Sequence, residues 1–485
     1  MLQDPTLLKN AAYINGAWCS ADSGEVFVVT NPATGEAITT VPDMAEQETR
    51  RAIDAAEAAW PAWREQAAKQ RAAVLRKWFE LIMANQDDLG RLMTAEQGKP
   101  LAEAKGEVAY GASFIEWFSE EAKRVYGDVI PSPFNDRRIV VIKQPIGVVA
   151  AITPWNFPIA MITRKCAPAL AAGCPVVVKP AALTPLSALA LAELAERAGI
   201  PKGVFNVVTS ESGVRVGKEM TANPTVRKLS FTGSTAVGKI LTRACADTMK
   251  KVSMELGGNA PFIVFSDADL DAAVSGAMAS KYRNAGQTCV CVNRFLVQDE
   301  IYDAFTDKLA TAVSQLQVGD GMTEGITQGP LINEAAVTKV NAHIQDALGK
   351  GARLICGGKR HAQGGTFFEP TVIADATPDM TVAREETFGP LAPIFRFQTE
   401  AEAIRLANDT EVGLAAYFYS RDIGRIWRVS EALEYGMVGI NEGIISNEVA
   451  PFGGVKESGL GREGSKYGID DFVEIKYLCM GGLDK

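Results

Sequence analysis

Short β-rich runs alternate with helical stretches along most of this chain, and this alternation restricts the possible fold more than any other feature. After Arg138 the runs occupy residues 139–142, 147–152, 175–178, 203–208 and 228–232, with helices such as 185–198 between several of them. A second series has strands at 262–265, 294–297, 392–397 and 437–441, separated by helices such as 301–316 and 335–348. Such alternation is typical of parallel sheets covered by helices. We therefore predict two α/β units, preceded by amphipathic helices over 45–63 and 69–89.

Composition excludes several classes of protein. The net charge of -9 is spread without a basic stripe, which argues against a nucleic-acid partner. The apolar stretch 146–162 is interrupted by prolines and an asparagine, and residues 1–10 lack a secretory signal pattern, so we expect no membrane span and no export. The 8 cysteines have neither disulfide nor metal-ligand spacing. These features predict a cytoplasmic protein without a metal site.

Two motifs indicate chemistry built from cysteine and glutamate. Cys289 ends the run Asn284–Cys289 (NAGQTC), and Glu255 begins the run Glu255–Asn259 (ELGGN). The chain has only 2 histidines, and neither lies in a motif, so a hydrolase that pairs cysteine with histidine is disfavoured. The glycines directly after Glu255 have no side chain, so another segment or a ligand can approach the backbone closely. Two glycines in this position would be unusual after a glutamate on the protein surface.

Two further motifs extend this pattern along the chain. They are Thr153–Pro158 (TPWNFP) upstream and Glu386–Pro390 (ETFGP) downstream. The motifs at 153, 255, 284 and 386 stand in one order over nearly half the sequence, so chance agreement is improbable. Together they resemble the NAD(P)-dependent aldehyde dehydrogenase superfamily, and the resemblance covers nearly the whole chain.

The resemblance implies an aldehyde dehydrogenase-like fold with two Rossmann-like parallel-sheet domains and a small β arm for oligomerisation. Residues 1–124 and 144–256 are expected to form the cofactor-binding domain, and 257–456 the catalytic domain. Residues 125–143 and 472–485 would form the arm of a homotetramer or dimer. The order of the motifs places the expected active site at the interface between the domains.

The resemblance also assigns catalytic roles. Cys289 would attack the aldehyde carbon, and the resulting thiohemiacetal would lose hydride to nicotinamide and become a thioester. Glu255 would activate the water that hydrolyses the thioester, a task suited to a desolvated carboxylate. Asn156 and the backbone N–H of Cys289 would form the oxyanion hole. A Cys289 thiol of this kind is expected to have a lowered pKa.

The residues expected to bind the cofactor are Trp155, Lys179, Ala182, Gly233, Ser234, Glu386 and Phe388. Ala182 stands where relatives that prefer NAD often have a glutamate, and without that carboxylate a 2′-phosphate is admissible, which favours NADP. Glu211, in a loop expected near the adenosine, could oppose the phosphate, so NAD stays open.

The run Gly233–Lys239 nearly matches a phosphate-binding P-loop, which leaves a P-loop NTPase as the alternative enzyme class. Ile240 stands where that motif needs Ser or Thr to hold magnesium, so the motif fails.

Two arginines close to these motifs suggest the substrate. Arg164 and Arg283, with Ser446, match the residues that bind the substrate carboxylate in succinate-semialdehyde dehydrogenases, and the stretch 451–468 is also similar to that group. Arginine offers paired donors that fit a carboxylate. The expected substrate is therefore succinate semialdehyde. Glutarate semialdehyde and other carboxylated aldehydes stay open, because one methylene contributes only about 1–3 kcal/mol to discrimination.

Cys291 lies two residues beyond Cys289 and is a possible redox partner. A second thiol near an oxidised nucleophile can trap it as a disulfide. The alternative is a small apolar side chain that only fills space.

Overall fold

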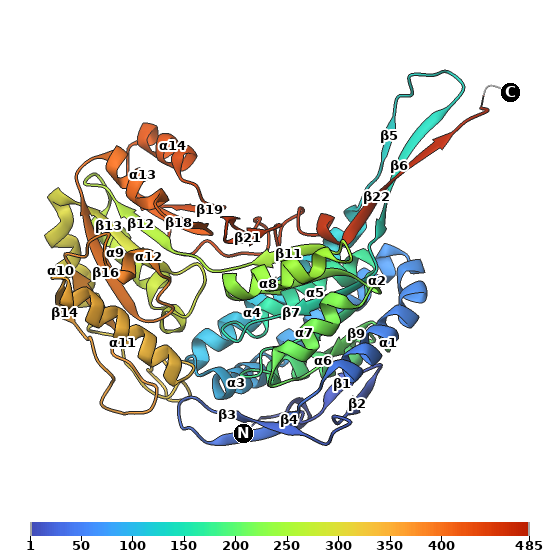
Figure 1. Cartoon of the computed structure of the whole chain (residues 1–485), viewed down its shortest axis with the longest axis horizontal. Helices are drawn as coiled ribbons and strands as arrows, with labels where there is room; N and C mark the ends of the chain where they lie inside the picture. The colour runs from blue at the N-terminus through green and yellow to red at the C-terminus, as the bar shows by residue number, and fades with distance from the viewer. Residues whose placement is uncertain (1, 484–485) are drawn as a thin grey trace.

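The computed structural model describes residues 2–483, which form two helix-covered sheets and a projecting three-stranded arm (Figure 1). Met1 and residues 484–485, which the predicted domain and arm ranges include, lie outside the described residues. The two sheets confirm the predicted α/β class.

The first sheet has 8 strands in the order β2-β1-β9-β8-β7-β10-β11-β21. They are β1 (Ala12–Ile14), β2 (Ala17–Cys19), β7 (Val148–Ile152), β8 (Val176–Lys179), β9 (Phe205–Val207), β10 (Val226–Thr232), β11 (Lys251–Glu255) and β21 (Gly459–Leu460). The strands from β9 to β11 are parallel, as predicted, whereas β1 and β21 pair antiparallel at either side of them. These short strands carry too little periodicity to be recognised in the sequence.

Side chains of alternate residues in the central strands pack into two different hydrophobic cores, one on each face of the sheet. Val149 and Ala151 of β7 pack with one cluster, and Val148 and Ala150 pack with another. Both faces of a parallel sheet are buried, so its strands are apolar on both sides. Helices α1 (Glu46–Glu65), α7 (Gly213–Ala222) and α8 (Thr235–Ala246) cover one face, and α2 (Ala68–Ala84), α4 (Leu101–Glu121), α5 (Ala160–Ala172) and α6 (Leu186–Ala198) cover the other.

The helix predicted over residues 69–89 is divided in two. Asn85 leaves helical geometry (φ -108°, ψ 20°), and α3 (Gln86–Gln97) begins directly after it. The side-chain amide of Asn85 donates to the Leu81 carbonyl at 2.8 Å, in addition to the backbone N–H of Asn85, which donates to the same carbonyl at 3.2 Å.

The second sheet has 7 strands in the order β14-β15-β16-β13-β12-β18-β19. They are β12 (Ala260–Val264), β13 (Val292–Gln298), β14 (Arg353–Cys356), β15 (Thr371–Ala374), β16 (Leu391–Phe397), β18 (Ala415–Tyr419) and β19 (Met437–Ile440). Only β14 is antiparallel to its neighbour. Its helices are α9 (Leu270–Lys281), α10 (Tyr302–Val313), α11 (Glu334–Gly349), α12 (Thr381–Arg384), α13 (Glu400–Asn408) and α14 (Ile423–Ala432).

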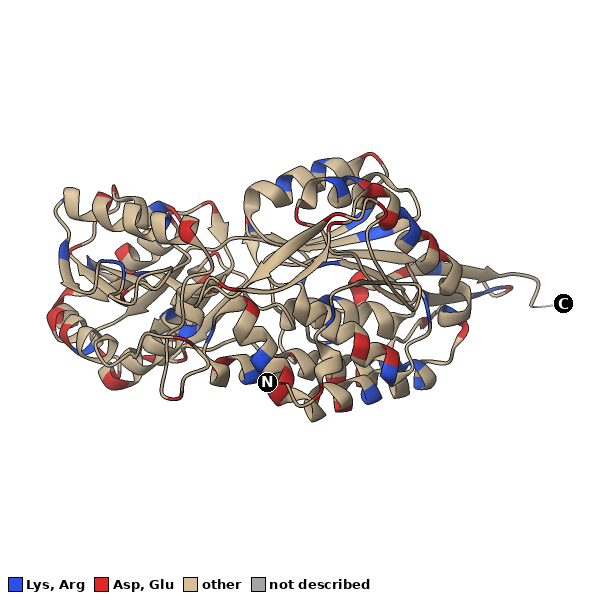
Figure 2. Ribbon diagram, turned by 90° about the horizontal axis from the view of Figure 1, so that it is seen from below, with Lys and Arg blue, Asp and Glu red and all other residues tan. Residues whose placement is uncertain are grey.

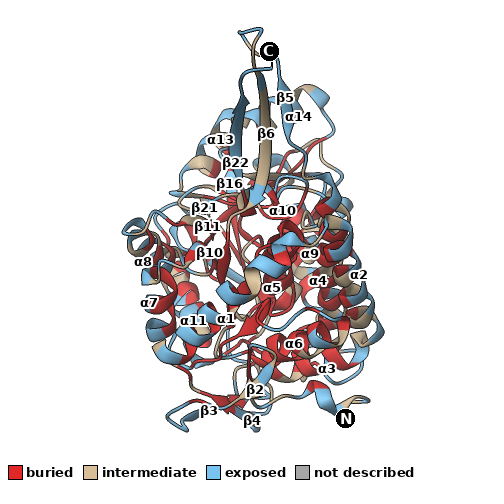
Figure 3. Ribbon diagram, turned by 90° about the vertical axis from the view of Figure 1, so that its right-hand side faces the viewer, coloured by how far each residue is buried: buried red, intermediate tan, exposed pale blue. Residues whose placement is uncertain are grey.

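The arm contains β5 (Asp128–Ile130), β6 (Arg138–Pro145) and β22 (Val473–Met480), and it extends away from the body (Figure 1). The run 139–142, which periodicity grouped with the first parallel series and the resemblance with the arm, belongs to β6 and pairs with β5 and β22. Figure 3 shows the arm strands as mainly exposed or intermediate, in contrast to the buried sheets. Val129 is 78% exposed and Ile475 is 71% exposed, so apolar side chains face outward here.

The small remaining sheets pair β3 (Val26–Thr30) with β4 (Ala37–Pro42) and β17 (Val412–Gly413) with β20 (Val455–Lys456). Basic and acidic residues are interspersed over both units (Figure 2). Within residues 2–483, no helix is both long and apolar enough to cross a membrane.

Candidate active site

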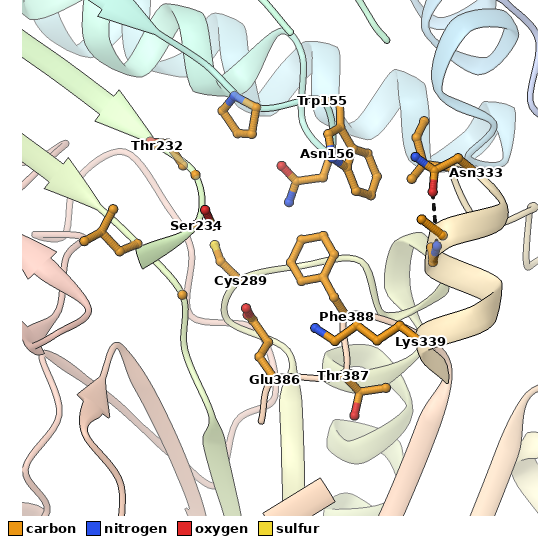
Figure 4. A pocket seen from close by; sticks show the side chains of 17 residues that line it. Trp155, Asn156, Thr232, Ser234, Cys289, Asn333, Lys339, Glu386, Thr387 and Phe388 are labelled. Carbon is orange, nitrogen blue, oxygen red and sulfur yellow. Dashed lines mark hydrogen bonds between the residues drawn. The ribbon is translucent and has the colours of Figure 1, made fainter. Parts of the chain in front are cut away.

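A cavity of about 380 Å³ lies at the carboxyl ends of β7, β10 and β11. Residues of both large units line it. Ligands of α/β proteins commonly bind at this edge of a sheet. The predicted residues Trp155, Asn156, Gly233, Ser234, Cys289, Glu386 and Phe388 all line the cavity. In Figure 4 the side chains of Asn156, Cys289, Glu386 and Phe388 point into this common space. Motifs separated by more than two hundred residues thus converge on one site.

Several features of the cavity fit a dinucleotide. Gly233 and Ser234 lead directly into α8, whose N-terminal amides and dipole favour phosphate. Gly233 leaves no room for a side chain, because a Cβ there would lie 2.4 Å from the Phe231 ring. Trp155 and Phe388 meet edge to face with ring centroids 5.6 Å apart and supply an aromatic wall.

Glu386 adds a carboxylate to this wall. It accepts a hydrogen bond from the Gly258 N–H at 3.4 Å, and burial raises its pKa to about 7. A carboxylate in this position can accept hydrogen bonds from the hydroxyl groups of a ribose.

The other two predicted cofactor residues lie outside the lining of this cavity. Lys179 ends β8, and burial lowers its pKa to about 8. Its Nζ atom lies 3.5 Å from the position that a Cβ on Gly213 would take, so it is directed toward the start of α7. Ala182 packs against the core of the first unit.

The P-loop alternative finds no support in the surroundings of Lys239. This lysine pairs with Glu457 at 2.7 Å, and both side chains are exposed. It therefore stands apart from the cavity that Gly233 and Ser234 line.

A sharp turn positions the Cys289 thiol. Asn284 and Ala285 have positive φ values of 51° and 54°, and Gly286 follows at 74°. A Cβ on Gly286 would lie 2.2 Å from the Gly389 carbonyl oxygen, so glycine is required. The turn is tied to the Asn156 loop, because Asn284 Nδ2 donates to the Asn156 carbonyl at 3.0 Å.

The environment of Cys289 differs from the expectation of a lowered pKa. Burial raises the pKa of this thiol to about 12, and the charge of Arg164 is the largest influence that opposes the rise. Nearby carboxylates of Glu386 and Glu255 raise it further. These surroundings favour the protonated form of the thiol in the protein without cofactor.

Asn156 is held rigidly at the opposite wall. Its Nδ2 donates to the Gln287 carbonyl at 3.1 Å, and its backbone carbonyl accepts a hydrogen bond from Lys99 Nζ at 2.7 Å. Lys99 is itself buried and paired with Glu107, whose carboxylate accepts the Ile159 N–H at the start of α5. These contacts fix the amide beside the nucleophile loop.

Glu255 ends β11 and lies outside the lining of the larger cavity. Both of its carboxylate oxygens are buried and accept no hydrogen bond from residues 2–483. Burial raises its pKa well above the usual range, and the negative charge of Glu463 raises it further. Both glycines after Glu255 are closely approached: a Cβ on Gly258 would lie 2.8 Å from the Cys289 carbonyl oxygen, and a Cβ on Gly257 would lie 3.2 Å from the Glu386 carboxylate.

A narrow second pocket adjoins the first, and Cys289 lines both. Arg164, Arg283 and Ser446, the three predicted substrate residues, line this pocket. Arg164 Nη2 and Arg283 Nε are buried and donate to no group in the described chain. The two guanidinium groups lie over aromatic rings, Arg164 at 4.1 Å from the Phe452 centroid and Arg283 at 5.4 Å from Phe157. Buried donor atoms without an acceptor are costly, so these two nitrogens are free to bind an anionic ligand.

Two residues of this region were missed by sequence reasoning. Tyr110 lines the pocket from α4, and Glu463 pairs with Arg164 and with Lys165. Tyr110 belongs to no motif that we identified, whereas Glu463 lies in the stretch 451–468, whose similarity to one group of the family was noted without a role for this residue.

Cys291 is buried beneath the nucleophile loop. Its thiol donates to the Gly286 carbonyl at 3.2 Å and accepts from Lys281 Nζ at 3.7 Å. Within residues 2–483, no group of three or more His, Cys, Asp or Glu side chains is arranged to hold a metal ion.

The sequence model of the Aldehyde dehydrogenase family matches residues 18–478. Glutarate-semialdehyde dehydrogenase of Pseudomonas aeruginosa is 67% identical, over 99% of this chain and 100% of that protein. The NADP(+) succinate-semialdehyde dehydrogenase of Escherichia coli is 66% identical, over 99% of each chain. The crystal structure of succinate-semialdehyde dehydrogenase from Burkholderia pseudomallei is 69% identical over 99% of each chain, with a TM-score of 0.98.

The chain therefore belongs to the aldehyde dehydrogenase family and is an oxidoreductase. The structural similarity confirms the predicted aldehyde dehydrogenase-like fold.

Proposed function

We propose that this enzyme oxidises an aldehyde with a distal carboxylate, with succinate semialdehyde as the leading candidate, and uses NADP or NAD. The observation that carries this proposal is a pocket adjoining Cys289 in which two arginine donors, Arg164 Nη2 and Arg283 Nε, are buried without an acceptor among residues 2–483, while the other side of the Arg164 guanidinium pairs with Glu463. Similar relatives named for succinate and for glutarate semialdehyde, at 66% and 67% identity, support the substrate class but do not rank the two chain lengths.

In the proposed mechanism, Arg164, Arg283 and Ser446 bind the carboxylate and so direct the aldehyde group toward Cys289. The Cys289 thiol first loses its proton to solvent, and the thiolate then adds to the carbonyl carbon, while the Asn156 amide with the Cys289 N–H stabilises the oxygen that becomes negative. A nicotinamide held beside Trp155, Glu386 and Phe388 would supply the hydride acceptor, and Cys289 would then carry the substrate as a thioester. Glu255 then removes a proton from the water that attacks this thioester and releases the acid.

The cofactor would be held by Trp155, Gly233, Ser234, Glu386 and Phe388, with Lys179 and the space beside Ala182 at the adenosine end. Ala182 has no carboxylate to repel a 2′-phosphate, and the Escherichia coli relative is named for NADP(+), so we favour NADP over NAD.

The domain roles and the assembly are further parts of this proposal. Residues 1–124 and 144–256 would bind the cofactor, 257–456 would carry the nucleophile, and the arm would join subunits into a homotetramer or dimer in the cytoplasm. The exposed apolar side chains of the arm support an interface there, because such surfaces are usually covered. A monomeric mass by light scattering would contradict this role.

The decisive experiment follows reduced-nicotinamide absorbance with succinate semialdehyde, glutarate semialdehyde and butanal, each with NADP and with NAD. Butanal has the chain length of succinate semialdehyde but no carboxylate. We expect kcat/KM to be much higher for both acid-bearing aldehydes and higher with NADP. Equal or better turnover of butanal would overturn the assignment of the carboxylate pocket.

We also propose that Cys291 can capture an oxidised Cys289. Peroxide converts the Cys289 thiol to a sulfenic acid and water, and attack by the Cys291 thiol forms a disulfide and releases a second water. We expect thiol reductants to restore wild-type activity after peroxide treatment and to restore Cys291→Ala poorly. Equal recovery of both would reject this role, and the contacts of Cys291 with Gly286 and Lys281 would then be only structural.

A further inference from the structure

Tyr110 carries a hydroxyl group into the pocket that Arg164 and Arg283 line. It lies on α4, and its ring packs on the cluster of Phe157, Ala160 and Met161. The ring also meets Phe114 edge to face, with centroids 5.1 Å apart. These contacts hold the ring in one orientation, so the position of the hydroxyl is determined by packing.

Gly111 explains how α4 brings Tyr110 so close to the substrate residues. A Cβ on Gly111 would lie 2.7 Å from the Ile159 side chain and 3.2 Å from the Ala160 backbone. Only glycine therefore permits this approach of α4 to α5, the helix that carries Arg164. The close packing of the two helices places Tyr110 and Arg164 on the same pocket wall.

The Tyr110 hydroxyl is a donor without an acceptor. Its oxygen is buried and its proton is donated to no group of residues 2–483, since the neighbouring Arg164 side chain can act only as a donor toward it. Burial raises the pKa of Tyr110, and this outweighs the opposing charges of Arg164 and Arg283. The hydroxyl therefore keeps its proton at neutral pH and can donate it to an anion.

The pocket has more unsatisfied donors than the two arginines supply. Tyr110 Oη, Arg164 Nη2, Arg283 Nε and Thr288 Oγ1 are all buried there without a partner in the described chain. Buried polar groups are almost always hydrogen-bonded in folded proteins, so a cluster of orphaned donors indicates a ligand rich in acceptors. A distal carboxylate is such a ligand.

We infer that Tyr110 is a further substrate-binding residue, whose hydroxyl donates a hydrogen bond to the distal oxyanion of the substrate beside Arg164. This rests on the proposed function and deepens it, because it gives the pocket a neutral donor as well as two cations. Tyr110 would favour an aldehyde whose terminal oxygens can accept this bond, and it would contribute nothing to an uncharged alkyl chain.

The variant Tyr110→Phe tests the inference, because it keeps the ring and removes only the hydroxyl. Tyr13→Phe is the matched control, since Tyr13 is also buried, at 3% exposure, and packs against Trp18 away from the substrate residues. We expect Tyr110→Phe to lower kcat/KM for succinate semialdehyde by about 10- to 100-fold, mainly through KM, as for loss of a bond to a charged group. We expect butanal turnover to be unchanged, and Tyr13→Phe to resemble wild type with both substrates.

A binding measurement separates contact with the anion from a general disturbance of the site. Equilibrium titration with succinate, the unreactive acid product, should show a weaker Kd for Tyr110→Phe by a similar factor. An equal loss of activity with succinate semialdehyde and butanal, or an unchanged succinate Kd, would overturn the inference. If the wild-type enzyme showed no preference for the acid-bearing aldehyde, the proposed function itself would be wrong. A wild-type preference that survives intact in Tyr110→Phe would overturn only the role of Tyr110.

Discussion

The carboxylate of Glu463 forms an ion pair with the guanidinium of Arg164, and both side chains are buried, at 6% and 1% exposure. Lys165 shares the same carboxylate at 2.5 Å. Backbone hydrogen bonds of 2.8 Å in both directions join Glu463 to Phe452, whose ring lies under Arg164. The negative charge of Glu463 is also, after burial, the largest influence that raises the pKa of Glu255. One carboxylate thus supports the proposed substrate anchor and raises the pKa of the proposed base.

Glu463→Gln should alter the pH profile of the enzyme. Removal of this negative charge removes an influence that raises the pKa of Glu255, so the base ionises at lower pH. The acidic limb of the kcat profile is therefore expected to move to lower pH. A limb that stays in place would show that Glu463 does not influence the catalytic base.

The same substitution should also reduce stability. It leaves Arg164 and Lys165 without their buried counter-ion, which is expected to cost about 3–5 kcal/mol in the free energy of unfolding. Glu116→Gln is the control, because its pair with Arg76 is exposed and should contribute only about 0–1 kcal/mol. Denaturant unfolding of the two variants measures the difference.

Glu255→Gln should separate acylation from hydrolysis. Without the base, the thioester on Cys289 would accumulate, so reduced nicotinamide should appear in a rapid burst followed by slow turnover. The steady rate should fall by roughly 10²- to 10⁴-fold. Stopped-flow absorbance checks this, with Glu57→Gln on the exposed face of α1 as the control. Loss of the burst together with the steady rate would assign Glu255 to an earlier step.

Alkylation of the enzyme without cofactor should report the protonation state of Cys289. With a pKa raised to about 12, the thiolate fraction and the rate of modification should increase about tenfold per pH unit through the neutral and alkaline range. The rate can be followed by mass spectrometry of the peptide that contains Cys289, and Cys289→Ala identifies that peptide. A plateau near neutral pH would indicate a thiol that is already activated.

Gly286→Ala should displace the nucleophile. The added Cβ would meet the Gly389 carbonyl oxygen at 2.2 Å, and the φ of 74° is unfavourable for alanine. We expect lower Tm and a large loss of kcat. Gly106→Ala is the contrasting control, because it lies within α4 with open space around it and should stabilise by about 0.4–1 kcal/mol. Equal behaviour of the two variants would contradict the tight fit at Gly286.

Sequence periodicity and short motifs predicted the parallel α/β class and the family, and both are confirmed by the structure and by the similar proteins. The strands around Val149 and Ile263 could be predicted because their apolar runs are local signals. The roles of Cys289, Glu255 and Asn156 were assigned from motifs and stay predictions, although the structure brings Cys289 and Asn156 to one cavity.

Only the tertiary structure decided what surrounds these residues. The β pattern of the run 139–142 does not distinguish a sheet strand from an arm strand, and its place in the arm, which only the resemblance implied, depends on pairing with β22 more than three hundred residues later. The substrate pocket likewise joins Tyr110, Arg164, Arg283 and Ser446 from distant parts of the chain. The pKa of Cys289 was expected to be low and is high, because burial and neighbouring carboxylates depend on packing that no local pattern encodes. Local sequence determines elements and motifs, whereas burial, charge and donor geometry arise only when distant segments pack together.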